Sequence, residues 1–138
     1  MLHLTGKEIS DSTVMKESLS KFISSLNTYS QEEIKAIVEN TKVEFFKKGE
    51  IILIENEVCN KCYFVLEGNV RQYQLVDGVE KTTAFFLEGQ AAISYDSYIE
   101  KRPSLYYLSC VENSILTAGT REQAEKTQEE FPKLEYLL

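Results

Sequence analysis

The stretch KKGEIILIENEVCNKCYFVLEGNVRQYQLVDGVEKTTAFFLEGQ, residues 47–90, decides the fold of this chain. Short runs of β-branched and aromatic residues alternate in it with turn-forming residues at near-regular spacing: Gly49, Asn56, Gly68, Asp77-Gly78 and Gly89. Short strands separated by turns at this spacing are typical of a compact antiparallel roll or barrel. A roll of this kind encloses a small interior that can hold a ligand.

Strands are expected both in this stretch and after it. Asp77-Gly78 predicts a two-residue hairpin, because both positions accept a positive φ. Gly68-Asn69 predicts another tight connection, and Glu112-Asn113-Ser114 a turn, whereas the pattern loosens from Ala91 to Pro103. The expected strands are Val43–Phe46, Glu50–Glu55, Cys62–Glu67, Val70–Val76, Glu80–Phe86, Leu105–Val111 and Ile115–Ala118.

Helical periodicity flanks the roll on both sides. Apolar residues recur at helical spacing from Asp11 to Asn27, and a second helix begins at a capping box of Ser30 and Glu33. We expect this pair to pack on the outside of the roll. A last helical tract begins at a second capping box, that of Thr120 and Gln123. It is followed by Phe131-Pro132 and by an apolar tail with Leu134, Tyr136, Leu137 and Leu138.

Size and composition fit one globular domain. The chain has 138 residues, of which 43% are hydrophobic and 27% charged, enough for one hydrophobic core. A formal net charge of −7 argues against a basic face for DNA or an anionic membrane. No run is long enough for a signal peptide or a membrane span, and three cysteines without a secretory signal indicate reduced thiols. We therefore expect a cytoplasmic protein that does not contact a membrane.

The order of these elements and one motif resemble a known family. The motif F-x-K-G-E-x-I, a turn residue and then Y-F-V-x-x-G is carried by Phe46, Lys48, Gly49, Glu50, Ile52, Asn56, Tyr63, Phe64, Val65 and Gly68. It resembles the cyclic-nucleotide-binding domain of the Crp–Fnr family of bacterial transcription regulators, over roughly Ser30 to Leu138. Asn56 stands where that family usually has glycine, and asparagine tolerates the left-handed conformation better than most residues.

The resemblance implies an α+β, mainly β fold. This is an antiparallel double-stranded β-roll, or jelly roll, with N-terminal helices and a C-terminal helix. We expect one sensor domain over residues 1–138, with the roll at about 41–119 and flanking helices at 11–40 and 120–138. The family's winged helix-turn-helix is absent from this sequence. DNA binding would need that missing domain, and the full-length protein would form a homodimer through the C-terminal helix after Phe131.

In that family a phosphate cassette, G-E-L followed downstream by R-S/T-A, binds the nucleotide. The arginine and the amides of a short helix neutralise the cyclic phosphate, and the glutamate binds the ribose. Aligned without gaps from Glu88-Gly89-Gln90, this chain has Ile93 at the cassette's glycine, Ser94 at its glutamate and Ser104 at its arginine, with Leu105-Tyr106 following. Each exchange removes a needed property. The resemblance therefore implies a degenerate cassette that does not bind cyclic AMP.

The segment of the former cassette supplies the candidate ligand contacts. Tyr95, Tyr98, Tyr106 and Tyr107 are expected to cluster there. They either fill the roll interior and cover its mouth, which we favour, or line a pocket for a less charged ligand. Two alternatives stay open: a cyclic-nucleotide receptor with a cassette rebuilt around Arg102, and a stand-alone protein-interaction domain. The candidate pocket residues are Gly89, Ala92, Ile93, Ser94, Tyr95, Arg102, Ser104, Leu105 and Tyr106.

No pattern for catalysis or metal binding accompanies this pocket. Cys59-Asn60-Lys61-Cys62 is a lone C-x-x-C, and a zinc site needs four ligands, of which only the distant Cys110 and His3 remain. Structural thiols are favoured over a redox pair, because Cys59 falls in a turn and Cys62 opens a strand. We expect no enzyme, no cofactor and no bound metal, but a regulatory domain with an unidentified small-molecule effector.

Overall fold

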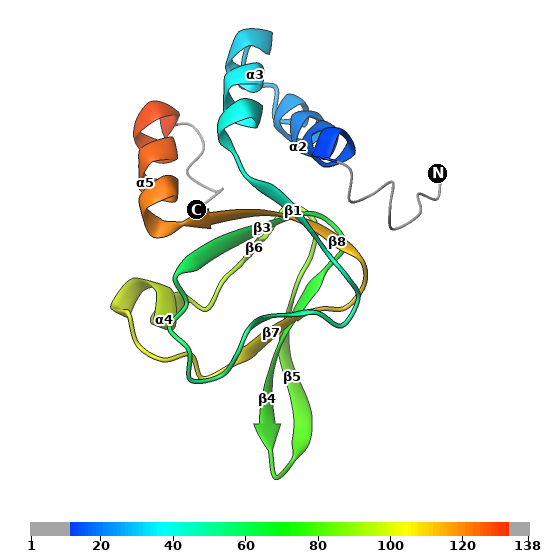
Figure 1. Cartoon of the computed structure of the whole chain (residues 1–138), viewed down its shortest axis with the longest axis vertical. Coiled ribbons are helices and arrows are strands. Elements are labelled where there is room, and N and C mark those ends of the chain that lie inside the picture. Colours follow the sequence, from blue (N-terminus) through cyan, green and yellow to red (C-terminus); the bar gives the residue numbers. More distant parts are fainter. Residues whose placement is uncertain (1–11, 133–138) are drawn as a thin grey trace.

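The computed structural model describes residues 12–132, and His3, Asp11 and the apolar tail after Pro132 lie outside this range. Two four-stranded antiparallel sheets form a roll, with helices at one end (Figure 1). The elements are α2 (Ser12–Ser25), α3 (Gln31–Asn40), β1 (Val43–Phe46), β2 (Ile51–Leu53), β3 (Lys61–Glu67), β4 (Val70–Val76), β5 (Val79–Phe86), β6 (Ala91–Ala92), α4 (Tyr95–Glu100), β7 (Tyr107–Cys110), β8 (Ser114–Thr120) and α5 (Arg121–Glu130).

The strand order confirms the expected fold class. One sheet has the order β1-β8-β3-β6 and the other β2-β7-β4-β5, and every pair is antiparallel. The chain therefore crosses from one sheet to the other at most of its connections, which is the topology of a jelly roll. The β4–β5 hairpin extends away from the helices (Figure 1).

Strand β3 connects two hydrophobic cores, because both of its faces are buried. Tyr63 and Val65 point into the core between the sheets. Phe64 and Leu66 point to the other side, into a core shared with α2 and α3. A strand buried on both faces has a nearly continuous apolar sequence, and CYFVL in β3 fits this description.

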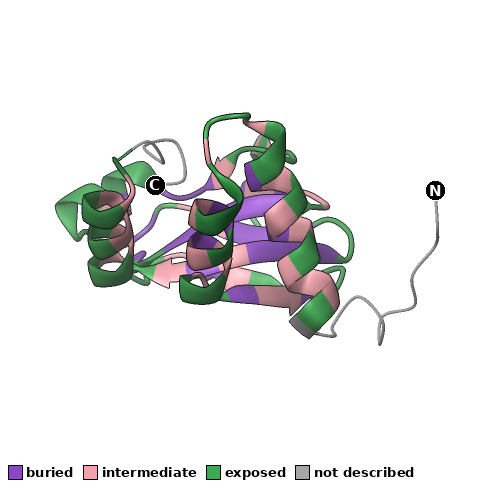
Figure 2. Ribbon diagram, turned by 90° about the horizontal axis from the view of Figure 1, so that it is seen from above, coloured by how far each residue is buried: buried purple, intermediate pink, exposed green. Residues whose placement is uncertain are grey.

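The N-terminal helices cover the outer face of the first sheet, as expected. Leu19 and Ile23 of α2 and Ile34 and Ile37 of α3 are buried against β1 and β3. Figure 2 shows the two helices over strands with many buried residues. Ser30 and Glu33 form the predicted capping box, and the box of Thr120 and Gln123 starts α5.

The turns account for several of the turn-forming residues in the stretch 47–90. Asp77 and Gly78 have φ values of 53° and 78°, so the predicted two-residue hairpin joins β4 to β5. Asn56 has a φ of 76°, which is the left-handed conformation expected where the family usually has glycine. Gly68-Asn69 is a tight connection, but it passes between the two sheets and does not form a hairpin.

The segment that looked irregular in the sequence contains two short elements that the pattern did not predict. Ala91 and Ala92 form β6, which pairs with Tyr63 and Phe64 of β3. Helix α4 follows after two residues. Both elements are too short to show a period in the sequence, and tertiary contacts fix them in place.

Candidate functional site

A cavity of about 500 Å³ opens beside α4, on the segment that holds the candidate residues. Strands β4 and β5 contribute Gln72 and Phe86 to its wall. The remaining lining residues come from α4 and from the segments before and after it: Ile93, Ser94, Tyr95, Asp96, Ser97, Arg102, Pro103, Leu105 and Tyr106. A volume of this size is within the range that holds a small-molecule ligand.

Helix α4 is held against the roll by its first turn. The buried Ser97 hydroxyl accepts a hydrogen bond from the Cys59 amide at 2.7 Å. Ser94 stands at the N-cap position but makes no side-chain cap bond. The acidic residue of the first turn is Asp96, which lies in the cavity wall. The wall therefore combines neutral hydroxyls with one exposed carboxylate.

Ser104 is buried, with 1% of its surface exposed, and its hydroxyl is fully committed to local bonds. The hydroxyl donates to the Tyr106 carbonyl at 2.8 Å and accepts from the Tyr106 amide at 3.1 Å. It also lies 3.3 Å from the Ser94 hydroxyl. Ser104 therefore holds two wall residues, Ser94 and Tyr106, in position from behind the cavity lining.

Arg102 is the only positively charged residue among the described residues that line the cavity. Its side chain is 61% exposed and pairs with the carboxylate of Glu100, which is itself half exposed. An ion pair this exposed contributes little to stability, so the guanidinium is not rigidly held. With Asp96 nearby in the wall, the local charge around the cavity is close to balanced or slightly negative.

A comparison of the sequence with family models finds one match, the cyclic nucleotide-binding domain, over residues 43–130. The chain belongs to the cyclic nucleotide-binding domain family. The match runs from β1 to the end of α5 and includes the whole cavity wall. A comparison with curated proteins found no match.

Solved structures share this domain's fold at low sequence identity. The catabolite activator protein of Thermus thermophilus is 21% identical, with a TM-score of 0.62 over 76% of this chain and 49% of that one. A CooA mutant from Carboxydothermus hydrogenoformans is 18% identical, with a TM-score of 0.63 over 81% and 70% of the two chains. The regulatory subunit of a cAMP-independent protein kinase A from Trypanosoma cruzi, bound to guanosine, is 17% identical, with a TM-score of 0.62 over 86% and 43%.

The family match confirms the expected cyclic nucleotide-binding domain, and the Thermus and Carboxydothermus structures share its fold. At this level of identity the structural neighbours show the fold and not a shared ligand. The chain spans about half the length of the Thermus protein. In the described part of the chain, no helix is both long and apolar enough to cross a lipid bilayer.

The structure brings most of the candidate residues of this cyclic nucleotide-binding domain to the cavity. Ile93, Ser94, Tyr95, Arg102, Leu105 and Tyr106 all line it. Three others do not. Gly89 belongs to the turn after β5 with a φ of 85°, Ala92 is buried in the core between the sheets, and Ser104 lies behind the wall.

Sequence reasoning missed Gln72, Phe86, Asp96, Ser97 and Pro103, which also line the cavity. The alternation of β4 and β5 could have indicated Gln72 and Phe86, because every second residue of a strand faces the roll interior. Nothing in the sequence marks Asp96 and Ser97, because α4 is too short for a helical period.

The four tyrosines do not gather as expected. Tyr95, 56% exposed, and Tyr106 border the cavity. Tyr107 instead stacks on Tyr73 with ring centroids 5.0 Å apart, and Tyr98 packs on the core and under the Arg121 guanidinium. A cavity of about 500 Å³ remains beside Tyr95 and Tyr106, so the choice between tyrosines that fill the roll and cover its mouth and tyrosines that line a pocket stays a prediction.

The thiols are buried and neutral. Burial raises the pKa of Cys62 and of Cys110 to about 11, and burial also raises the pKa of Cys59. None of the three forms a disulfide bond. A thiol with a raised pKa is a poor nucleophile and a poor metal ligand at neutral pH. Among residues 12–132, no group of three or more His, Cys, Asp or Glu side chains is arranged to hold a metal ion.

Proposed function

We propose that this chain is the ligand-sensing regulatory domain of a Crp–Fnr-type transcription regulator, and that its pocket binds an uncharged small molecule instead of a cyclic nucleotide. The observation that carries the proposal is Ser104. In the gapless alignment Ser104 falls at the position of the cassette arginine. In the structure it is buried, and its hydroxyl bonds to Tyr106 and Ser94.

The proposal follows from the cost of burying a charge. A cyclic phosphate carries one negative charge, and its transfer from water into a protein needs a cationic partner. At the arginine position this chain offers a hydroxyl that is already satisfied. Arg102 is the remaining candidate, but it lies at the exposed edge of the cavity and is paired with Glu100. Asp96 in the same wall adds repulsion for an anion.

The rest of the lining suits a neutral, flat molecule. Phe86, Ile93 and Leu105 supply apolar surface, and Tyr95 and Tyr106 supply rings with polar ends. Gln72 and Ser97 supply amide and hydroxyl groups that can fix an orientation. The guanosine-bound structure of the Trypanosoma cruzi neighbour supports the idea that this fold accommodates a nucleoside without a cyclic phosphate.

The regulatory part of the proposal rests on family membership. We infer a non-enzymatic sensor in the cytoplasm of a bacterium, as one domain that is joined in the full protein to a helix-turn-helix. Ligand binding would shift the equilibrium between two arrangements of the C-terminal helix, which requires different affinities for the two states. Homodimerisation would use the helix that follows Phe131.

Matched pairs of probes test the pocket. The domain is titrated with adenosine and cyclic AMP, and with guanosine and cyclic GMP, while backbone amide resonances are recorded. We expect each nucleoside to bind at least as tightly as its cyclic nucleotide, with shifts at Ile93–Ser97 and Leu105–Tyr106. A cyclic nucleotide that binds more tightly than its nucleoside, through Arg102, would instead support a rebuilt cassette and overturn the proposal.

A further inference from the structure

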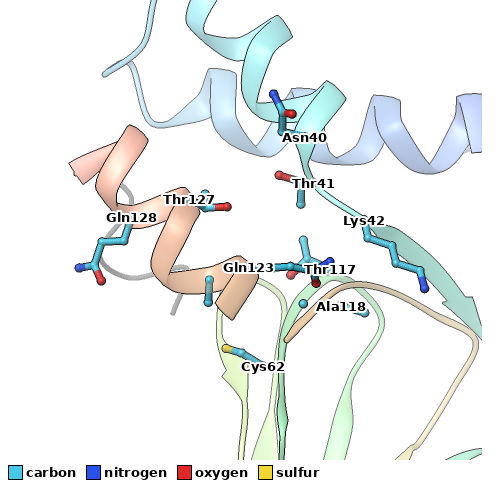
Figure 3. Close-up of a pocket in the computed structure, with 11 residues that line it drawn as sticks. Asn40, Thr41, Lys42, Cys62, Thr117, Ala118, Gln123, Thr127 and Gln128 are labelled. Carbon is cyan, nitrogen blue, oxygen red and sulfur yellow. The ribbon is translucent and has the colours of Figure 1, made fainter. Parts of the chain in front are cut away.

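A second cavity, of about 110 Å³, lies outside the roll between the end of α3 and α5 (Figure 3). It is separate from the cavity beside α4, because the two share no lining residue. Three segments form its walls: residues 40–42 at the α3–β1 junction, residues 117–119 of β8, and the inner side of α5. Cys62 of β3 lies beneath.

The floor of this cavity is small, apolar and uncharged. Cys62 and Ala118 are buried, and Ala124 of α5 also lines the space. The Cys62 thiol is neutral, because burial raises its pKa to about 11. Lys42 is the only charged residue among the lining residues that the structure describes, and its ammonium group lies 2.6 Å from the Glu44 carboxylate. An ionic ligand would therefore lose hydration without gaining a free counter-charge.

The α3 side of the cavity has spare hydrogen-bond acceptors. The Asn40 amide nitrogen donates to the Ala36 carbonyl at 2.7 Å. A carbonyl can only accept, so this bond fixes the amide orientation and leaves the Asn40 Oδ1 as an acceptor. The Thr41 hydroxyl donates its hydrogen to the Ile37 carbonyl at 2.7 Å, so it too can only accept.

The α5 side has spare donors. The Gln123 Oε1 accepts from the Thr120 amide at 2.9 Å in the capping box. An amide N–H can only donate, so the Gln123 Nε2 hydrogens remain for a ligand. Thr127 and Gln128 also line the cavity, and Figure 3 shows the side chains of the two walls on opposite sides of the space.

We propose that this cavity is a binding site for a small uncharged carboxamide or lactam. Its carbonyl accepts from Gln123 Nε2, its N–H donates to Asn40 Oδ1 or Thr41 Oγ1, and its apolar part rests on Cys62 and Ala118. The volume of about 110 Å³ is smaller than the cavity of about 150 Å³ that holds benzene, so a single ring enters only because this space is open to solvent on one side. The two amide groups are fixed by the backbone bonds that they already make, so the site is preorganised.

Such a ligand would join two elements that are otherwise weakly connected. No described side chain of α5 is buried, so the helix packs loosely on the roll. A molecule bound to both Gln123 and Asn40 bridges α5 to the end of α3. Occupancy of this cavity therefore holds α5 in place.

Benzamide is the probe, with benzoate and benzamidine as charged molecules of the same shape. Amide resonances of the whole chain are followed during titration. We expect saturable shifts with benzamide at residues 40–42, 117–119 and 123–128, with a dissociation constant of about 1 mM for a ligand of so few atoms. Hydrogen exchange in α5 should slow at saturation. Benzoate and benzamidine should bind at least about tenfold more weakly, because each lacks a counter-charge there.

Two variants of the cavity lining and one control variant outside it test the site. Gln123→Glu keeps an oxygen for the Thr120 amide but removes the Nε2 donors, so benzamide affinity should fall about tenfold or more. Gln31→Glu makes the same change on an exposed position of α3 outside the cavity, and should bind like the wild type. Ala124→Leu fills the space and should abolish the shifts.

Several results would overturn the proposal. These are the absence of saturable shifts with benzamide, shifts confined to the cavity beside α4, equal binding of the charged analogues, and undiminished affinity in Gln123→Glu or Ala124→Leu. Unchanged resonances of the roll in each variant establish that the variant is folded.

Discussion

Of the glycines that the structure describes, Gly68 leaves the least room for a side chain. Its φ is 95°, and a Cβ atom there would lie 2.2 Å from the Ser114 hydroxyl and 2.9 Å from the Asn113 carbonyl. Gly68→Ala should therefore lower the free energy of unfolding by about 3 kcal/mol, from backbone strain together with the clash. Gly78→Ala is the control, because its φ of 78° gives the same strain with open space around the new methyl group. If urea unfolding shows that Gly68→Ala and Gly78→Ala lower the free energy of unfolding equally, the clash with Ser114 and Asn113 does not contribute.

The buried thiols predict how stability depends on pH. Burial raises the pKa of Cys62 from 9.0 to about 11, so the fold favours the neutral thiol. The contribution of the neutral Cys62 thiol to the free energy of unfolding is fully present below pH 9, and it is lost as the pH rises through 11. Between these values the wild type should lose on the order of 2 kcal/mol more than Cys62→Ala does. Val65→Ala, a buried change without a titrating group, should keep the wild-type pH dependence. The same loss in all three proteins would contradict this assignment.

Single residues also show what sequence can and cannot predict about the site. The glycine-like role of Asn56 was predictable, because a turn at that position needs a positive φ and asparagine accepts one. That Ser104 falls at the arginine position is a prediction from spacing alone, and it stays a prediction. The buried position of Ser104 behind the wall and its bonds to Tyr106 were not predictable, because they depend on how the segment after α4 returns to the roll.

Among the elements, α5 has no fully buried side chain, and one of its contacts is a cation–π interaction. The Arg121 guanidinium lies 4.3 Å from the centre of the Tyr98 ring, which joins α5 to α4. Removing the guanidinium in Arg121→Ala should destabilise the docking of α5 by about 1 kcal/mol and speed hydrogen exchange there. Lys126→Ala, at an exposed position of the same helix, should leave exchange in α5 nearly unchanged. Equal acceleration in both variants would mean that the ring contact does not hold α5.

Elements with strong local signals were predicted and the others were not. Both capping boxes and the Asp77-Gly78 hairpin are determined by residues adjacent in sequence, so pattern reasoning finds them. In contrast, β6 has two residues and α4 has six. Their conformation depends on partners far along the chain, such as the Cys59 amide for Ser97. For the same reason the sequence shows which tyrosines lie near α4 along the chain, but it does not predict where their side chains lie in the fold.

At the scale of the whole molecule, β3 makes the two cores interdependent. Tyr63 and Val65 belong to the core between the sheets, whereas Phe64 belongs to the core under the helices. We predict that residues 1–138 unfold as one domain in a single transition, recorded equally by far-UV circular dichroism and tyrosine fluorescence. Phe64→Ala should lower the free energy of unfolding by about 4 kcal/mol and keep the transition single. Helices that melt before the sheets would show that two cooperative units exist.

The overall topology was predictable because the family motif ties the turns to a known strand order. The family resemblance does not predict which ligand the pocket binds. The central claim is that the roll has kept its cavity and lost its cationic partner for a cyclic phosphate, since the hydroxyl of Ser104 is committed within the protein.

Calorimetric titration of the wild-type chain with cyclic AMP tests this claim most directly. We predict no saturable heat up to a cyclic AMP concentration of about 1 mM, which corresponds to a binding free energy weaker than about −4 kcal/mol. Micromolar binding that disappears in Arg102→Ala would contradict the account, because it would mean that Arg102 has replaced the cassette arginine.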